Sequence, residues 1–248
     1  MIKAFSRAIA QLSDPKLRRV FWIGVIGSVV IFAALWGGIA YFLSTTEFFE
    51  FSLFGREFSL DFISDILGNL TVLVLTWLLF PSVITLIASL FLEDVAAAVE
   101  ERHYPGLPGP RRQSIAEILW ITLKFALAGI ILNILALPVI IVLIFFPPFN
   151  LFVFYGLNGY LLGREYFELV AHRRLEPGSA RRVRRNFRAQ VFVAGVIIAL
   201  LMTVPIVNLV APIIATAAMV HLMHGWRERL QAAGGAQGLE TDKSLETG

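Results

Sequence analysis

One uncharged run near the N-terminus constrains this chain more than any other feature. Val20–Leu43 holds 24 residues without a charged side chain, directly after the basic segment Lys16–Arg19. As an α-helix this run is about 36 Å long, which is enough to cross a hydrocarbon core of about 30 Å with some tilt. Because a long helix that is apolar on every face has no place on a soluble domain, the run predicts a membrane-spanning helix.

The composition agrees with a membrane protein and excludes several chemistries. Of the 248 residues, 57% are hydrophobic and only 16% are charged, with a mean hydropathy of +0.75. The chain has no cysteine, which excludes thiol catalysis, iron–sulfur clusters, thiolate zinc sites and disulfides. The net charge of +3 comes from basic clusters beside apolar runs, so it indicates membrane topology and no nucleic-acid partner.

The first half of the chain predicts two crossings. Ser13-Asp14-Pro15 is typical of a helix cap and precedes the first span, about residues 16–43. The acidic segment 44–65 belongs outside under the positive-inside rule, and the uncharged run 66–92 predicts the second span. Both chain termini are therefore expected in the cytoplasm.

Two further helices flank these crossings. Residues 1–15 predict a short amphipathic helix suited to the membrane interface. Its apolar side consists of Ile2, Phe5, Ile9 and Leu12. After the second span, a helix over Glu93–His103 is expected to stop at Pro105-Gly106.

The second half has shorter apolar arms, which predict two hairpins at about residues 115–163 and 189–226. Their turns share the pattern Pro-x-x-Asn-Leu. The arms 149–163 and 191–204 are only about 22 Å and 21 Å long as helices, short of a full crossing. A competing interpretation makes every arm a full span, with six helices in all and the same placement of the termini.

The predicted fold is thus an all-α integral membrane protein with two long transmembrane helices and two helical hairpins that penetrate the bilayer in part. Residues 1–230 form a single membrane domain in this prediction, and residues 231–248 form a disordered tail. Gly156, Gly159 and Gly163 recur at spacings that favour close helix packing.

Pro15–Arg19 is the first candidate site. The free amides of a helix N-terminus favour an oxyanion, and Arg18 and Arg19 add planar donor forks that match sulfate or phosphate oxygens. The alternative is a topology signal that contacts lipid headgroups.

Three residues in the second half are candidates for a substrate pathway. Asn150 and Asn208 lie in the paired turns, where interrupted apolar segments mark transporter substrate sites, although each asparagine is equally suited to N-cap its returning arm. Lys124 is a basic residue inside an apolar run, and it is either functional or extends to the interface.

Several other charged groups have simpler explanations. The arginine cluster of residues 173–188 is suited to concentrate anions or bind acidic lipid, and it also fits the positive-inside bias. Glu165, Glu168 and His172 share one helix face, and His221 and His224 another, but a metal site needs ligands from separate elements. Neither a metal nor a cofactor is expected, and without a catalytic motif the chain is not expected to be an enzyme.

Three segments together resemble one protein family. Leu12–Arg19, Val99–Arg102, and Val204–Leu209 with Ala211-Pro212 are similar to the CysZ sulfate-permease family, to which eukaryotic etoposide-induced membrane proteins are related. The similarity covers roughly residues 1–230. Pro147-Pro148-Phe149-Asn150 departs from the family, which is expected to have a glycine-containing turn there.

The resemblance implies sulfate uptake across a bacterial inner membrane, by a channel-like permease that supplies cysteine synthesis. It implies a homo-oligomer, two spanning helices and two partly inserted hairpins. It places an oxyanion-binding element on Leu17, Arg18 and Arg19, with Pro15 shaping the turn. The alternative function is a non-transporting membrane scaffold that binds partners or anionic lipid through its arginine-rich segment.

Overall fold

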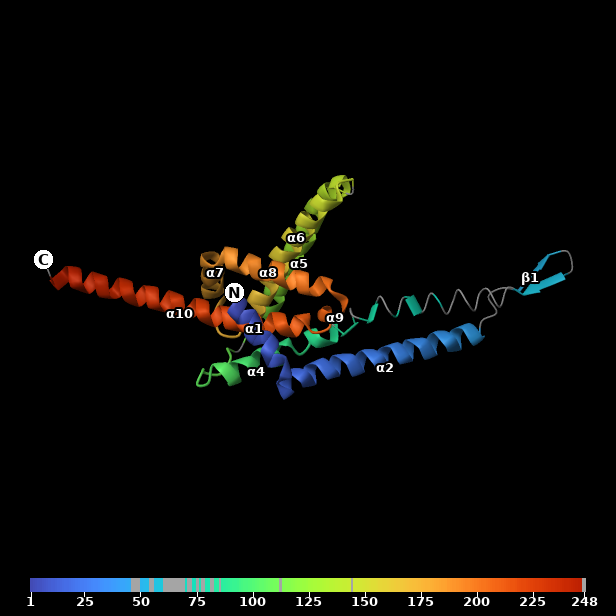
Figure 1. The fold of residues 1–248 in the computed structure, drawn as a ribbon, viewed down its shortest axis with the longest axis horizontal. Helices are drawn as coiled ribbons and strands as arrows, with labels where there is room; N and C mark the ends of the chain where they lie inside the picture. Colours follow the sequence, from blue (N-terminus) through green and yellow to red (C-terminus); the bar gives the residue numbers. More distant parts are fainter. Residues whose placement is uncertain are drawn as a thin grey trace. The chain divides into compact units, whose positions relative to one another are not determined.

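The computed structural model describes residues 1–45, 50–53, 56–59, 86–111, 113–143 and 145–246, together with residues 70, 73, 74, 76, 79, 80, 83 and 84 (Figure 1). They divide into two compact units, Arg18–Phe91 and the rest of the chain. Two of the described helices are long and apolar enough to cross a membrane, in the segments Pro15–Gly38 and Ile115–Leu143. The predicted class, an all-α integral membrane protein, is confirmed.

The Arg18–Phe91 unit contains most of α2 (Pro15–Thr45) and a small hairpin of β1 (Glu50–Leu53) and β2 (Arg56–Ser59). The strands pair antiparallel, with Glu50 opposite Ser59. This hairpin lies in the segment predicted as an acidic loop, and hydropathy does not predict its strands. The predicted second span, residues 66–92, lies largely outside the described residues.

Close packing within this unit depends on glycine. A Cβ atom at Gly24 would lie 3.5 Å from Ile84, and one at Gly27 would lie 3.0 Å from Ile87 Cδ1. Ser28 donates a hydrogen bond to the Gly24 carbonyl at 2.8 Å, which satisfies a buried hydroxyl within the apolar helix. Small residues thus let α2 approach the following chain, as is common between membrane helices.

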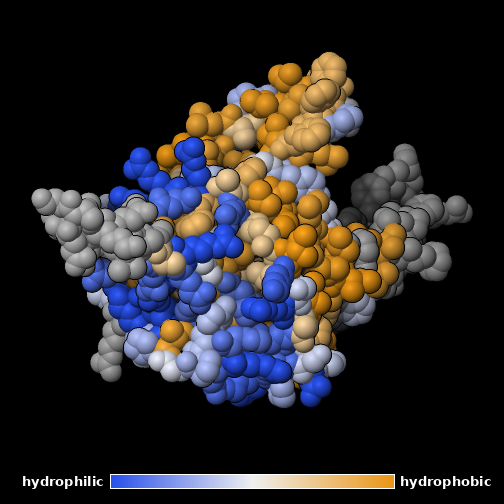
Figure 2. All heavy atoms as spheres, turned by 60° about the vertical axis from the view of Figure 1, so that its left-hand side comes forward, coloured by the Kyte–Doolittle hydropathy of each residue, from blue (hydrophilic) through white to orange (hydrophobic). Residues whose placement is uncertain are grey.

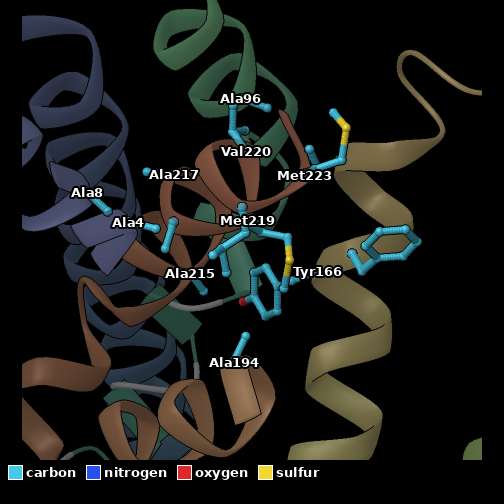
Figure 3. Close-up of a cluster of buried hydrophobic side chains, with 14 of the residues drawn as sticks. Ala4, Ala8, Ala96, Tyr166, Ala194, Ala215, Ala217, Met219, Val220 and Met223 are labelled. Carbon is cyan, nitrogen blue, oxygen red and sulfur yellow. The ribbon is translucent and has the colours of Figure 1, made fainter. Parts of the chain in front are cut away.

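The larger unit is built around α10 (Ala211–Glu246). The core side chains in Figure 3 come from α10 and from helices that include α1 (Ile2–Ala10), α4 (Leu92–His103) and α6 (Pro147–Ala171). Residues on α10 such as Met219, Val220 and Met223 are completely buried. Hydrophobic burial of this helix therefore organises the unit.

The short helix α1 forms where predicted, and only part of its predicted apolar side is buried in the core. Ala4, Phe5 and Ala8 pack into the core, whereas Ile2 and Ile9 are exposed. Small alanines allow α1 to lie close to α10 (Figure 3), so close approach decides the buried face here, and not hydrophobicity alone.

The predicted helix after the second span is confirmed as α4. It ends at His103, and Gly106 then adopts φ +85°, a left-handed conformation that favours glycine.

The first predicted hairpin consists of α5 (Ile115–Leu143) and α6, which run side by side (Figure 1). With 29 residues α5 is about 43 Å long, and it continues through both Lys124 and Pro138. The two prolines at 147 and 148 begin α6 instead of forming the turn, because proline fits the first turn of a helix. Hydrophobic side chains cover the outer end of the hairpin (Figure 2): Phe145, Phe146, Phe149 and Phe152 are all exposed.

The second predicted hairpin is shorter on its entering side. Its entering arm, α8 (Arg188–Thr203), has 16 residues and is about 24 Å long, which is short of a full crossing. The short helix α9 (Pro205–Asn208) follows, and α10 is the returning arm. The length of α8 therefore agrees with the prediction that this hairpin penetrates the bilayer only in part.

Glycines set the crossing of α6 and α8. A Cβ atom at Gly159 would lie 2.5 Å from Val196 Cγ2, and one at Gly195 would lie 2.5 Å from the Gly163 nitrogen. Apart from its chain neighbours and its own helix backbone, no described atom lies within 4 Å of a Cβ at Gly156. The packing role predicted for the glycines thus holds for Gly159 and Gly163 but not for Gly156.

The basic segment after α6 contains α7 (Pro177–Asn186), which lies at 86° to α8. At the other end of this unit, α10 continues through residues 231–246, for which the sequence predicts a disordered tail. That disorder and the single domain of residues 1–230 stay predictions.

Candidate functional site

The start of α2 is held by ion pairs from α4. Asp14 Oδ1 accepts a hydrogen bond from the Lys16 backbone N–H at 2.9 Å, and Arg102 donates to Asp14 Oδ2 at 2.7 Å. Lys16 Nζ lies 2.5 Å from Glu101 Oε2. Two of the segments that carry the family resemblance, Leu12–Arg19 and Val99–Arg102, therefore contact each other directly.

Asp14 is the predicted helix cap, and its partners control its ionisation. Burial alone would raise the pKa of Asp14, but the hydrogen bonds from Arg102 and from the Lys16 backbone hold it below its usual value. A charged carboxylate therefore sits at the positive end of the α2 dipole, where it stabilises the helix.

In the predicted oxyanion element, the backbone at the helix start and the two arginines differ in whether they are available to an anion. The carboxylate of Asp14 already uses an amide at the helix start, Pro15 occupies the first helical position, and Leu17 is buried with 1% of its surface exposed. Arg18 and Arg19 are exposed, and neither forms an ion pair with any described residue. The guanidinium groups, more than the helix amides, are thus available to an anion.

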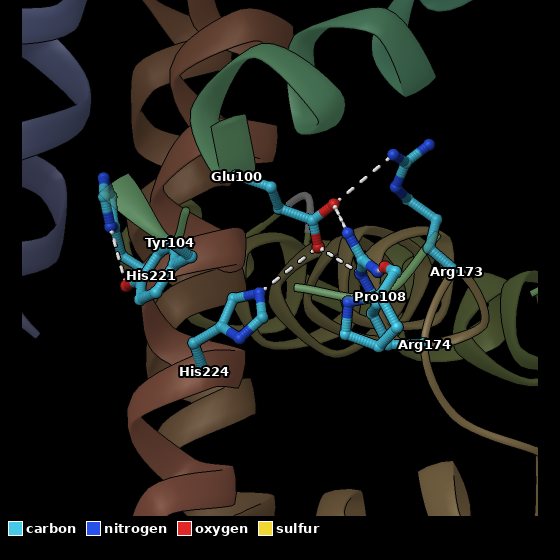
Figure 4. A network of polar contacts seen from close by, with 7 residues as sticks. All are labelled: Glu100, Tyr104, Pro108, Arg173, Arg174, His221 and His224. Carbon is cyan, nitrogen blue, oxygen red and sulfur yellow. Dashed lines mark hydrogen bonds and ion pairs between the residues drawn. The ribbon is translucent and has the colours of Figure 1, made fainter. Parts of the chain in front are cut away.

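A buried ionic cluster forms around Glu100, on the buried face of α4 (Figure 4). Glu100 accepts hydrogen bonds from Arg174 Nε at 3.0 Å and Arg174 Nη2 at 2.8 Å, and Arg173 Nη2 lies at 3.4 Å. His224 Nε2 lies 3.2 Å from Glu100 Oε1, the oxygen that also accepts from Arg174 Nε. Burial would raise the pKa of Glu100, but the hydrogen bonds from His224 and Arg174 and the charges of both arginines lower it to about 2.

Sequence reasoning did not identify Glu100 as a cluster centre. The side chain is 3% exposed, and those of Arg173 and Arg174 are 8% and 9% exposed. One signal was present: Glu100 lies one helical turn after Ala96, on the buried face of α4. A carboxylate on an apolar helix face requires cationic partners from elsewhere in the fold.

The two histidines of α10 have partners of their own. Tyr104 stacks on His224 with ring centroids 4.2 Å apart, and its hydroxyl lies 3.0 Å from His221 Nδ1. Glu168, from the other group considered for metal binding, pairs with arginines. Within the part of the chain that the structure describes, no three side chains of metal-ligating type come together.

Lys124 lies in a pocket between α5, α6 and α7, which we call the Lys124 pocket. It is lined by Glu117, Trp120, Ile121, Lys124, Arg164, Phe167, Glu168, His172, Pro177, Ala180, Arg181 and Arg184. The ammonium group of Lys124 sits 4.4 Å from the centre of the Trp120 ring. Lys124 is exposed, and it lines a pocket that Arg164, Arg181 and Arg184 also line.

The carboxylates of this pocket are already committed. Glu117 pairs with Arg111, and Glu168 lies 2.8 Å from Arg164 and 3.4 Å from Arg184. Lys124 and Arg181 have no carboxylate partner among the described residues. The pocket thus carries excess positive charge, which favours an anion.

Asn150 and Asn208 occupy the two hairpin turns differently from each other. Asn150 lies inside the first turns of α6, and Asn208 ends α9, three residues before α10 begins. The alternative in which each asparagine N-caps its returning arm is therefore wrong. Both side chains are partly exposed, and their role in a pathway stays a prediction.

Comparison with known proteins identifies the family. No curated protein matches the chain. A family described as sulfate transporter CysZ/etoposide-induced protein 2.4 matches residues 4–212, which include the start of α2, Glu100 with Arg173 and Arg174, and the Lys124 pocket. The chain therefore belongs to the family of the sulfate transporter CysZ and etoposide-induced protein 2.4, a family of transporter-type membrane proteins.

Proposed function

We propose that this protein carries sulfate, or a closely related oxyanion, across a bacterial inner membrane and so supplies sulfur for cysteine synthesis. The family match over residues 4–212 is the observation that carries the proposal. The protein acts as a multi-pass permease with both termini in the cytoplasm, assembles as a homo-oligomer, and catalyses no reaction.

Arg18 and Arg19 are the proposed capture site. Sulfate is a tetrahedral dianion, and two adjacent guanidinium groups offer paired N–H donors to its oxygens. Their exposure and the lack of an ion pair to any described residue support this role. Pro15 and Leu17 serve the site by fixing the start of α2, and neither contacts the anion through a polar side chain.

The Lys124 pocket is the proposed second part of the pathway. Lys124 and Arg181 supply positive charge that no described carboxylate neutralises. Both line a pocket whose walls come from α5, α6 and α7. Asn150 and Asn208 are proposed to contact the anion with their amides at the hairpin turns. The centres of the apolar runs contain no acidic residue, so we infer channel-like movement without proton coupling.

Uptake of labelled sulfate into proteoliposomes tests the function. We expect flux that chloride does not compete away, and a loss of about tenfold or more in an Arg18→Ala/Arg19→Ala variant, because a hydrogen bond to a charged group contributes about 1.5–3 kcal/mol. Arg227→Ala/Arg229→Ala removes the same charge from α10 and should leave flux intact.

The outcomes separate the site from the function. Full flux in the Arg18→Ala/Arg19→Ala variant would reject the capture site while leaving transport in place. Absence of flux for any oxyanion with correctly assembled wild-type protein would reject transport itself.

A further inference from the structure

A second hollow, which we call the arginine groove, lies beside the Lys124 pocket at the junction of α6, α7 and α8. It is lined by Tyr160, Arg164, Arg181, Arg184, Arg185, Arg188, Val191 and Phe192. Arg185 and Arg188 belong to this groove alone, as do its aromatic and aliphatic residues. The groove therefore combines five cationic side chains with an apolar side and contains no carboxylate of its own.

Most of this positive charge is unopposed. Arg164 and Arg184 share the single carboxylate of Glu168. No described acidic residue pairs with Arg181, Arg185 or Arg188. Guanidinium groups gathered in this way repel one another, so a bound anion would stabilise the arrangement.

The helix geometry places the groove at the boundary between water and lipid. α7 buries Ala180 and Val183 against the protein and turns its arginines outward. It meets the apolar helix α8 at 86° (Figure 1), so when α8 enters the bilayer, α7 lies along the membrane surface at the level of the headgroups. A basic helix in this orientation is suited to acidic headgroups.

The apolar side of the groove favours a phospholipid over a small inorganic anion as the ligand. Tyr160 is 46% exposed and Phe192 is 40% exposed, and exposed Val193 and Leu200 continue the apolar surface along α8. An inorganic ion would use only the arginines, whereas a phospholipid uses the arginines for its phosphate and the apolar surface for its acyl chains.

We propose that the arginine groove binds the phosphate headgroup of an anionic phospholipid, with an acyl chain against Tyr160 and Phe192. The groove shares Arg164, Arg181 and Arg184 with the Lys124 pocket, whereas Arg185 and Arg188 line the groove alone, so a change at these two residues tests lipid binding separately from the proposed pathway. The bound lipid neutralises the arginines of α7 and anchors the α7–α8 corner at the membrane surface.

Native mass spectrometry of the full chain in detergent tests this site, with phosphatidylglycerol and phosphatidylcholine added as probes. We expect preferential retention of phosphatidylglycerol, weakened about thirtyfold in an Arg185→Gln/Arg188→Gln variant, since each basic residue near an anionic surface contributes about 1 kcal/mol. Arg227→Gln/Arg229→Gln is the matched control for net charge and should bind like the wild type.

Three results would overturn the proposal. One is equal retention of the two lipids by the wild type. Another is an equal loss of phosphatidylglycerol in the control variant. The third is displacement of phosphatidylglycerol by millimolar inorganic phosphate, which would assign the groove to a soluble anion. The thermal stability of each variant is measured in parallel, and the single variants Arg185→Gln and Arg188→Gln replace the double variant if it does not fold.

Discussion

Replacing Glu100 with glutamine should destabilise the protein strongly, because it removes the only charge that compensates two buried arginines within the described cluster. Arg173 and Arg174 stay buried in the variant and lose their carboxylate. The glutamine carbonyl can accept from one of the donors, but its NH₂ group faces the others. Breaking a buried ion pair in this way costs about 3–5 kcal/mol.

The pKa of Glu100 gives a second route to the same magnitude. Its value of about 2 in the folded protein lies below the ordinary 4.5. Each pKa unit corresponds to about 1.4 kcal/mol, so the folded environment favours the charged form by about 3 kcal/mol. For a chain of this length that corresponds to a fall in Tm of about 6–12 °C.

The assay is thermal unfolding of the Glu100→Gln variant in detergent near neutral pH, with the loss of monodisperse protein as the measured signal. Glu101→Gln is the matched control, because the neighbouring side chain is 71% exposed and its ion pair with Lys16 contributes less than about 1 kcal/mol. The stabilisation from Glu100 is present above pH 4.5 and is lost as the pH falls towards 2. A Glu100→Gln variant that melts within about 2 °C of the wild type at neutral pH would refute this reasoning.

Three further predictions follow from local geometry. Gly195→Ala should prevent α6 and α8 from packing against each other and should alter the size-exclusion profile, since its Cβ would lie 2.5 Å from the Gly163 backbone nitrogen. Gly156→Ala adds a Cβ in open space and should leave the size-exclusion profile unchanged. Asp14→Asn should lower Tm at neutral pH. Because the pKa of Asp14 in the folded protein lies below 3.8, the difference in Tm between variant and wild type should shrink as the pH falls below that value. An unchanged difference in Tm at low pH would contradict this prediction. Hydrogen exchange should be fast over residues 231–246, the predicted disordered tail, and protection equal to that of the core of α10 would disprove the prediction.

Helix positions were largely predictable from the sequence, and the faces they bury were not. The caps and breakers around α4 act within a few residues, so its end at His103 could be predicted. The face of α1 depends on how closely another helix approaches, and that distance is absent from a hydropathy pattern. The hairpin prolines were assigned to a turn, although they begin α6, because proline is typical both of turns and of the first turn of a helix.

The candidate site divides in a similar way. Arg18, Arg19 and Lys124 were identifiable because a basic residue beside or within an apolar run is conspicuous in the sequence. The groups that surround Lys124 were not identifiable, since the Lys124 pocket joins side chains of three separate helices.

By itself, the sequence determined that this protein is a helical membrane protein, because hydropathy over a run of residues is a local quantity that decides the solvent of a helix. Only the tertiary structure decided which charges meet. Glu100 contacts Arg174 and His224 from 74 and 124 residues away, and Arg102 reaches Asp14 across 88 residues. Such pairings arise when packed helices bring distant residues together and burial makes an unpaired charge costly.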